Sequence, residues 1–253
     1  MSLGREPADM GAARPADRRS VVAALAQVAT LGDYFAVSTE SGGTGWRPAA
    51  QVYQDGMLDL VGFTARQLRV SENRVAVSIA QLGYAARLWS PSLACALCHG
   101  IVPELSGLQI GAELPIRLRL PRPRGWHATE PVPMAELLYR TVIVGQLEPL
   151  AAGLDSRIAS GPRIASGLLW GNAASALAGA LGVLVRANPG LAEAARDTAE
   201  LLLCTGRLRG TGQFTGAGLD FRRRSCCLYY RVPGGGLCGD CSLGASWRPA
   251  APP

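Results

Sequence analysis

Long apolar stretches alternate along this chain with short polar, glycine-rich or proline-rich breaks. In several stretches the apolar residues recur every three or four positions, which is the spacing of an amphipathic helix. The pattern predicts helices from about residue 20, over 71–86, 91–100, 134–147 and from 188 to about 202. We expect Ser20 and Ser71 to cap two of them, Pro91 to open the third and Pro149 to end the fourth.

Two segments have the character of strands. Residues 114–120 carry leucine or isoleucine at alternate positions, which is the period of a half-buried strand, and residues 34–38 are β-prone. The sequence therefore predicts a helix-rich α+β fold, with a large N-terminal domain and a short C-terminal module that holds four cysteines.

Residues 168–185 contain no charge over 18 positions. As a helix this stretch would be about 27 Å long, just short of a bilayer core of ~30 Å. It also contains Asn172, Ser175 and three glycines. We expect a buried core helix here, and at most peripheral association with a membrane.

The domain organisation follows the changes in composition. Residues 1–19 are rich in Ala, Arg, Pro and Asp without apolar periodicity, which predicts a disordered tail. Residues 20–205 form the predicted helical α+β domain. Residues 206–245 are a glycine-rich connector followed by the cysteine module, and residues 246–253 are a second tail.

The charge does not indicate nucleic-acid binding. The net charge is +6, but the chain has no lysine and its 25 arginines are scattered, without a basic stripe interleaved with aromatic residues. Arg18 and Arg19 precede an apolar run and resemble a twin-arginine export signal. The run continues into apolar sequence of domain character, so an amphipathic first helix and a cytoplasmic location are preferred.

Four of the seven cysteines lie close together. Cys226 and Cys227 are adjacent, ten residues follow, and Cys238 and Cys241 are separated by two residues. This clustering predicts a four-thiolate metal site in a reducing compartment, not a disulfide scaffold. Both thiolates of the adjacent pair can reach one site only if the backbone bends there. The spacing favours an iron–sulfur cluster but leaves a zinc site open.

Other residues are candidates for supporting roles. Arg222, Arg224 and Arg231 are near the cysteines in sequence and are expected to surround the cluster, with a solvated basic patch as the alternative. Trp170, Asn172 and Arg223 are candidates for contact with substrate. For Asn172, a structural hydrogen bond within an apolar helix is the alternative.

Several further motifs are given other interpretations. Cys95, Cys98 and His99 match the haem-attachment pattern, but they lie in a predicted core helix where cysteine packs as a small apolar residue. The glycine-rich segment 210–216 has one residue too many for a dinucleotide fingerprint, and a chain without lysine has no Walker motif. We therefore expect no direct NAD(P)H site. An iron–sulfur cluster in this chain would receive its electrons from an external donor such as a ferredoxin or a flavin reductase.

The C-terminal sequence resembles a known family. The run from Phe221 to Arg231, followed by Gly-Gly-Gly-Leu and Cys238-Gly-Asp-Cys241, is similar to the signature of the FhuF-type ferric-siderophore reductases. Residues 74–91 and 169–177 resemble the family's internal helical blocks.

The resemblance implies a [2Fe–2S] cluster with Cys226, Cys227, Cys238 and Cys241 as its ligands. It also implies one-electron reduction of a ferric siderophore in the cytoplasm, which releases Fe(II) for assimilation. The alternatives are a non-catalytic electron carrier with the same cluster, and a siderophore-binding protein with a structural zinc.

Overall fold

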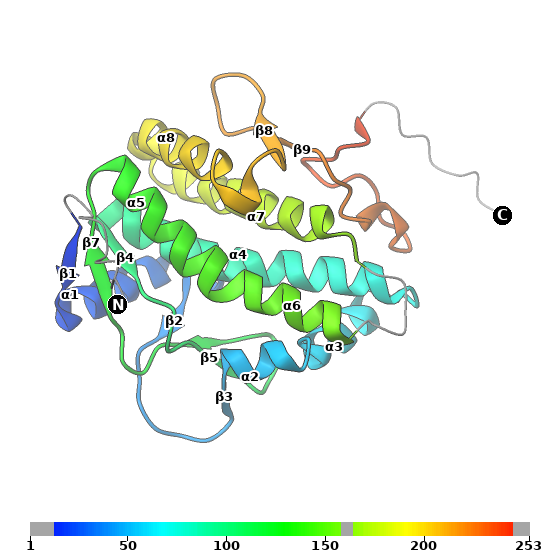
Figure 1. Cartoon of the computed structure of the whole chain (residues 1–253), viewed down its shortest axis with the longest axis horizontal. Coiled ribbons are helices and arrows are strands. Elements are labelled where there is room, and N and C mark those ends of the chain that lie inside the picture. The colour runs from blue at the N-terminus through cyan, green and yellow to red at the C-terminus, as the bar shows by residue number, and fades with distance from the viewer. Residues whose placement is uncertain (1–12, 158–163, 245–253) are drawn as a thin grey trace, which may run out of the picture.

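The computed structural model describes residues 13–157 and 164–244, with an α+β fold dominated by helices (Figure 1). The α-helices are α1 (Arg18–Val28), α2 (Ala49–Gln54), α3 (Leu58–Leu68), α4 (Asn73–His99), α5 (Pro131–Leu138), α6 (Glu148–Arg157), α7 (Ser166–Ala187) and α8 (Ala192–Leu203). Shorter helical segments are η1 (Ala29–Leu31), η2 (Asp33–Phe35), the π-helical η3 (Tyr139–Leu147), η4 (Pro189–Leu191), η5 (Gly206–Leu208) and η6 (Tyr229–Arg231). The strands are β1 (Arg14–Ala16), β2 (Val37–Ser38), β3 (Trp46–Pro48), β4 (Ile101–Pro103), β5 (Gln109–Gly111), β6 (Leu118–Arg119), β7 (Gly125–His127), β8 (Gly212–Phe214) and β9 (Phe221–Arg223).

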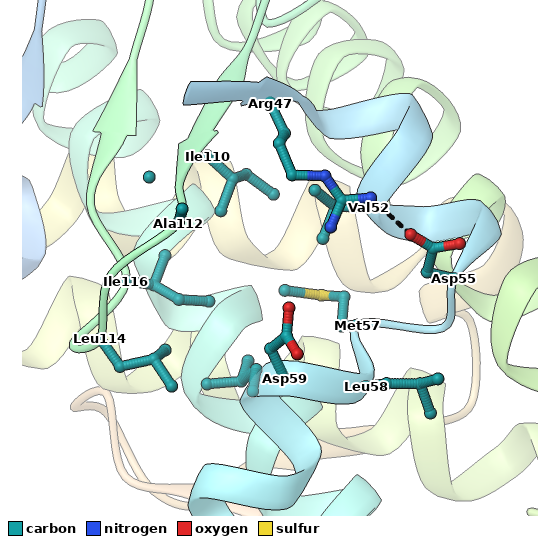
Figure 2. Close-up of a pocket in the computed structure, with 12 residues that line it drawn as sticks. Arg47, Val52, Asp55, Met57, Leu58, Asp59, Ile110, Ala112, Leu114 and Ile116 are labelled. Carbon is teal, nitrogen blue, oxygen red and sulfur yellow. Dashed lines mark hydrogen bonds and ion pairs between the residues drawn. The ribbon is translucent and has the colours of Figure 1, made fainter. Parts of the chain in front are cut away.

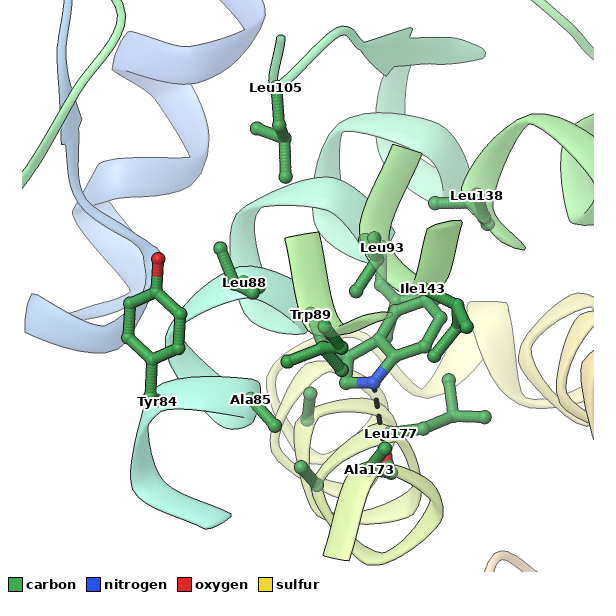
Figure 3. Packing of buried hydrophobic residues seen from close by; sticks show 14 of the residues in the cluster. Tyr84, Ala85, Leu88, Trp89, Leu93, Leu105, Leu138, Ile143, Ala173 and Leu177 are labelled. Atoms are coloured by element: carbon green, nitrogen blue, oxygen red, sulfur yellow. Dashed lines mark hydrogen bonds between the residues drawn. The ribbon is translucent and has the colours of Figure 1, made fainter. Parts of the chain in front are cut away.

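Helices α4 and α7 pack against each other at the centre of the fold. Small residues such as Ala173 on α7 are fully buried, which lets the two backbones approach closely. Trp89 on α4 is also fully buried, and its indole Nε1 donates to the carbonyl of Ala173 over 3.0 Å (Figure 3). The apolar ring is thus removed from water while its one polar atom is paired.

Three small sheets surround this helical core. Their strand orders are β1-β7-β4, β2-β6-β5-β3 and β8-β9. The pairings are antiparallel except for that of β2 with β6. The β8–β9 hairpin lies against α7 and leads into the four-cysteine segment, drawn in orange to red in Figure 1.

The first described residues are ordered, so the predicted tail through residue 19 is wrong in that part. Arg14 to Ala16 pair with β7, and α1 begins at Arg18. Asp17 caps α1, not Ser20, because its carboxylate accepts the Ser20 N–H (3.0 Å). Residues 14–16 are held by pairing with β7, which lies far along the chain. Their own sequence therefore shows no apolar periodicity. Residues 1–12 lie outside the described part of the chain, as do residues 245–253 of the module's end and second tail.

Helix α4 is continuous, whereas the sequence predicted a new helix at Pro91. It begins at Asn73 after Glu72, two residues beyond the predicted cap Ser71. Pro91 is buried within it. A proline in a helix interior lacks one backbone donor. Packing of the flanking residues Leu88, Trp89 and Leu93 in the core outweighs this cost.

The expected helix end at Pro149 is also wrong. Segments α5, η3 and α6 follow one another without a break from Pro131 to Arg157, and Pro149 falls in the first turn of α6. Proline has no N–H, so the helical run lacks one backbone hydrogen bond at the junction between η3 and α6. The π-helical η3 before it departs from the ordinary α-helical spacing.

The strand within residues 114–120 is shorter than the alternating apolar residues predicted. Only Leu118 and Arg119 pair as β6, while Leu114 and Ile116 line cavities. Pro115 cannot donate a ladder hydrogen bond. Residues 34–38 likewise form a strand only at Val37–Ser38, after the helical turn η2.

Helix α7 confirms the prediction of a buried core helix for 168–185. Among the described residues, α7 is the one helix that is long enough and apolar enough to cross a membrane. However, 72% of its most apolar window is buried inside the fold. After it, Asn188 makes no side-chain cap, and α8 starts at Ala192 after the short η4.

Candidate metal centre

The backbone bends directly after the adjacent cysteines. Leu228 adopts the left-handed conformation (φ 67°), and its N–H donates back to the Sγ of Cys226 (3.3 Å). A strand would have directed the two side chains to opposite faces. The bend predicted from the sequence is therefore present, made by a non-glycine residue in an uncommon conformation.

The loop between the two cysteine pairs reverses through glycines. The Gly235 N–H donates to the carbonyl of Val232 (2.8 Å), with Pro233 and Gly234 (φ 70°) between them. A Cβ on Gly235 would lie 2.7 Å from the Tyr229 carbonyl oxygen. This close approach requires glycine, and the reversal returns the chain toward the first pair.

A second tight turn carries the other pair. The Cys241 N–H donates to the Cys238 carbonyl (3.2 Å) across Gly239 and Asp240. The Leu243 N–H donates to the Sγ of Cys241 (3.4 Å). Backbone N–H groups that point at cysteine sulfur are typical of iron–sulfur sites, where they stabilise negative sulfur ligands.

One sulfur from each pair is in contact. The Sγ atoms of Cys227 and Cys238 lie 3.4 Å apart. The hydrogen bond between these two sulfurs lowers the pKa of Cys227 to about 6 and raises the pKa of Cys238. Burial raises the pKa of Cys226, with smaller contributions from the thiols of Cys227 and Cys241. Cys226 thus lies within electrostatic range of Cys227 and Cys241, and Cys227 within range of Cys238.

The part of the chain that the structure describes holds no set of three or more His, Cys, Asp or Glu side chains already arranged around a metal position. The contact between Cys227 and Cys238 is the closest approach to one. Ligation by all four cysteines therefore requires their sulfurs to move closer together within 226–241, as expected where metal binding and local folding are coupled.

The module is attached to α4 and α7 by buried polar contacts. The Ser78 hydroxyl on α4 donates to the carbonyl of Cys227 (2.7 Å). Asn172 on α7 donates from Nδ2 to the Ser78 carbonyl (2.8 Å) and accepts at Oδ1 from Arg223 Nη2 (2.6 Å). Arg223 Nε also donates to the Ser225 carbonyl (2.6 Å). This network holds the cysteine loop in place. Two of its members, Ser78 and Ser225, were not predicted from the sequence.

Gly171 permits this attachment. A Cβ at position 171 would lie 2.0 Å from the Ser225 Oγ and 3.2 Å from Arg223 Nη2. A side chain on this turn of α7 would displace the segment that leads to Cys226. A glycine inside a predicted core helix, beside Asn172, was the available signal in the sequence.

Arg223 is a buried cation beside the cysteines. Its exposed fraction is 1%, its Nη1 has no partner, and within residues 13–157 and 164–244 it forms no ion pair. A buried charge needs a compensating charge. Arg223 also lowers the pKa of Cys227, after the larger effects of its hydrogen bonds and burial. Four thiolates around a [2Fe–2S] cluster would be such an anion, so the donor set and its surroundings fit this cofactor.

The other arginines near the module have different surroundings. Arg231, expected near the cluster, instead binds Glu72 at the start of α4 (2.7 Å). Arg224 points to Gln213 (3.4 Å) and is exposed. Arg222 is exposed and lines a cavity of about 440 Å³ together with Cys238 and Cys241. Of the three, Arg222 is the one that stays beside the cysteines.

Asn172 and Arg223, expected to contact substrate, do not face an open surface in the structure. Both side chains are buried, with exposed fractions of 0% and 1%, and they bind each other. These contacts favour the structural alternative for Asn172. Trp170 is 8% exposed, and the Arg207 guanidinium covers its ring at 5.5 Å.

The remaining cysteines lie apart from this site. Cys95 is fully buried in α4, and burial raises its pKa to about 12. Cys98 and Cys204 are exposed. The burial of Cys95 confirms the prediction that it packs as a small apolar residue in a core helix. It does not fit a haem-attachment site.

Comparison with known families agrees with this geometry. The fold is helix-rich with four cysteines near its C-terminal end, and residues 223–243 match the family model described as the FhuF 2Fe-2S C-terminal domain. The chain thus carries a C-terminal domain of the FhuF type, as the sequence resemblance predicted. A search of the curated proteins found no match. The name of the domain supports a [2Fe–2S] cluster over zinc.

Proposed function

We propose that this chain is a ferric-siderophore reductase that transfers one electron to the iron of the chelate. The observation that carries the proposal is the position of the cysteine loops at the protein surface. Cys238 and Cys241 are partly exposed and line the 440 Å³ cavity, with Arg222 beside them. A chelate that enters this cavity would reach the ligand sulfurs without a change in the helical domain.

The chemistry requires little of the protein. When bound, the cluster supplies one electron at a time. Fe(III) in the chelate accepts that electron and becomes Fe(II), which the hard oxygen donors of a siderophore hold less tightly. No bond in the siderophore has to break. Arg223 and Ser78 hold the cysteine loop in place, and the open cavity admits the substrate.

Cys226, Cys227, Cys238 and Cys241 are the proposed ligands. We further propose that the protein acts in the cytoplasm and receives its electrons from an external ferredoxin or flavin reductase. The burial of α7 in the fold supports a location outside the bilayer core. No nucleic-acid partner is proposed.

The decisive experiment follows electrons and iron together. Cluster-loaded protein is reduced under argon with one equivalent of dithionite-derived electrons and mixed with a ferric trihydroxamate siderophore. We expect reoxidation with one Fe(II) trapped per chain, and a rate that saturates with siderophore concentration. The Ga(III) complex of the same siderophore, which cannot be reduced, is the control and should leave the protein reduced.

Other outcomes point to the alternatives. A rate that rises linearly with the concentration of any oxidant would indicate a non-catalytic electron carrier. Reoxidation by the Ga(III) complex would mean that an oxidant other than the chelated metal is responsible.

A further inference from the structure

A second cavity lies on the opposite side of α4 from the module's attachment. Its volume is about 630 Å³, larger than the cavity beside the cysteines. It lies between α3, α4 and the segment before β6. Its apolar walls include Leu60, Phe63, Ile79, Ala80, Leu114 and Ile116.

One partly buried cation lies in this apolar cavity. The Arg87 guanidinium is placed over the Tyr34 ring at 5.6 Å, and one Nη2 contact to the Ala36 carbonyl is long, at 3.4 Å. Its Nε is buried and has no hydrogen-bond partner among residues 13–157 and 164–244. Burial lowers the pKa of Arg87, which reflects the cost of keeping this charge away from water.

The other charged groups at the cavity do not satisfy Arg87. Asp33 raises the pKa of Arg87 through its charge, but it is exposed and forms no ion pair with Arg87 in the described residues. Arg117, on the far wall, pairs with Glu113 at 3.0 Å. Arg87 is thus the cation lining this cavity whose buried N–H donor lacks a partner in the described part of the chain.

A neighbouring cavity provides a contrast. It shares Leu114 and Ile116 with the larger one, but its volume is only about 180 Å³ (Figure 2). Its arginine, Arg47, is already paired with Asp55. An anion would gain no open partner there.

We propose that the 630 Å³ cavity binds a small apolar molecule that carries one anionic group, with that group on Arg87 and its apolar part against Phe63 and Ile79. An apolar lining with a single well-placed charged group is typical of sites for amphipathic ligands. Arginine binds carboxylates and sulfonates through several parallel N–H donors. The site is separate from the cysteines, so the proposal does not depend on the reductase activity.

Decanoate is the probe, and decan-1-ol is its uncharged counterpart. Calorimetric titration of the cluster-loaded full chain is expected to show saturable binding of one decanoate. Arg87→Met, which retains an apolar stem, should weaken decanoate binding by at least about tenfold and decan-1-ol binding by less than about twofold. Arg87→Lys should retain a large part of the decanoate affinity because it keeps the charge.

Two further variants locate the site. Thr64→Trp, on the α3 wall, should abolish binding of both probes by filling the cavity. Arg140→Met, at Trp126 and beside a different cavity, should leave both affinities unchanged. Folding of each variant is checked by circular dichroism. Decanoate binding that does not saturate would overturn the proposal. So would decanoate binding that is as strong in Arg87→Met and Thr64→Trp as in the wild-type protein.

Discussion

Arg223 in the cysteine module donates to Asn172 at the centre of the fold over 2.6 Å, and both side chains are buried. Asn172 in turn binds Ser78, whose hydroxyl holds the Cys227 carbonyl. Two helices and the cysteine loop therefore share one polar network. This network places a positive charge beside the four cysteines.

Replacement of that charge should change the reduction potential. A cluster becomes more negative on reduction, so the Arg223 cation stabilises the reduced state. We expect Arg223→Gln to lower the potential by on the order of 60 mV, a tenfold change in a one-electron equilibrium. The measurement is a redox titration followed by EPR. Arg224→Gln, an exposed neighbour, is the matched control, and equal shifts in both variants would contradict a specific role for Arg223.

The module should be sensitive to a single methyl group on α7. Gly171→Ala places a Cβ 2.0 Å from the Ser225 Oγ, so we expect a loss of about 1–3 kcal/mol in unfolding free energy and weaker retention of the cluster. Gly179→Ala on the same helix places a Cβ that, among the described residues, has no heavy atom within 4 Å beyond its chain neighbours and its own helix backbone. It should stabilise the protein by about 0.4–1 kcal/mol, since alanine restricts the unfolded chain. Urea unfolding and the half-life of cluster absorbance measure the two effects.

The ligand assignment has a direct test in the cysteines themselves. Cys238→Ser and Cys241→Ser should lose the visible absorption and the EPR signal of the reduced cluster, because each removes one thiolate ligand. Cys95→Ser should retain both, since Cys95 is buried in α4. Loss of the spectrum in Cys95→Ser, with retention in Cys238→Ser, would show that the assignment is wrong.

Buried cysteine and tyrosine side chains make the free energy of unfolding fall at alkaline pH. Burial raises the pKa of Cys95 to about 12 and that of Tyr53 well above its usual value. The unfolded chain therefore releases these protons at lower pH than the folded one, and stability falls as the pH rises from about 9 toward 12. One such proton corresponds to about 1.4 kcal/mol per pH unit. In urea unfolding at several pH values, Cys95→Ala should show a shallower decline than wild type above pH 9; an unchanged slope would exclude Cys95 as a cause.

Local sequence predicted the features that depend on spacing along the chain. The four cysteines, the bend after Cys227 and the turn at Gly239-Asp240 all follow from which residues are neighbours in sequence. The buried character of α7 follows from its uncharged composition. These predictions held because a metal-binding loop and an apolar helix are encoded by contiguous residues.

Only the tertiary structure decided which polar residues serve which site. The sequence assigned Arg222, Arg224 and Arg231 to the surroundings of the cluster and Arg223 to substrate. In the structure Arg223 is the buried one of the four, and Arg231 binds Glu72, which lies 159 positions away. The continuation of α4 through Pro91 likewise depends on core packing contributed by distant segments. The cysteine pattern was therefore determined by the sequence itself, whereas the charge beside it was decided by long-range packing, because burial and pairing depend on residues that the chain brings together only on folding.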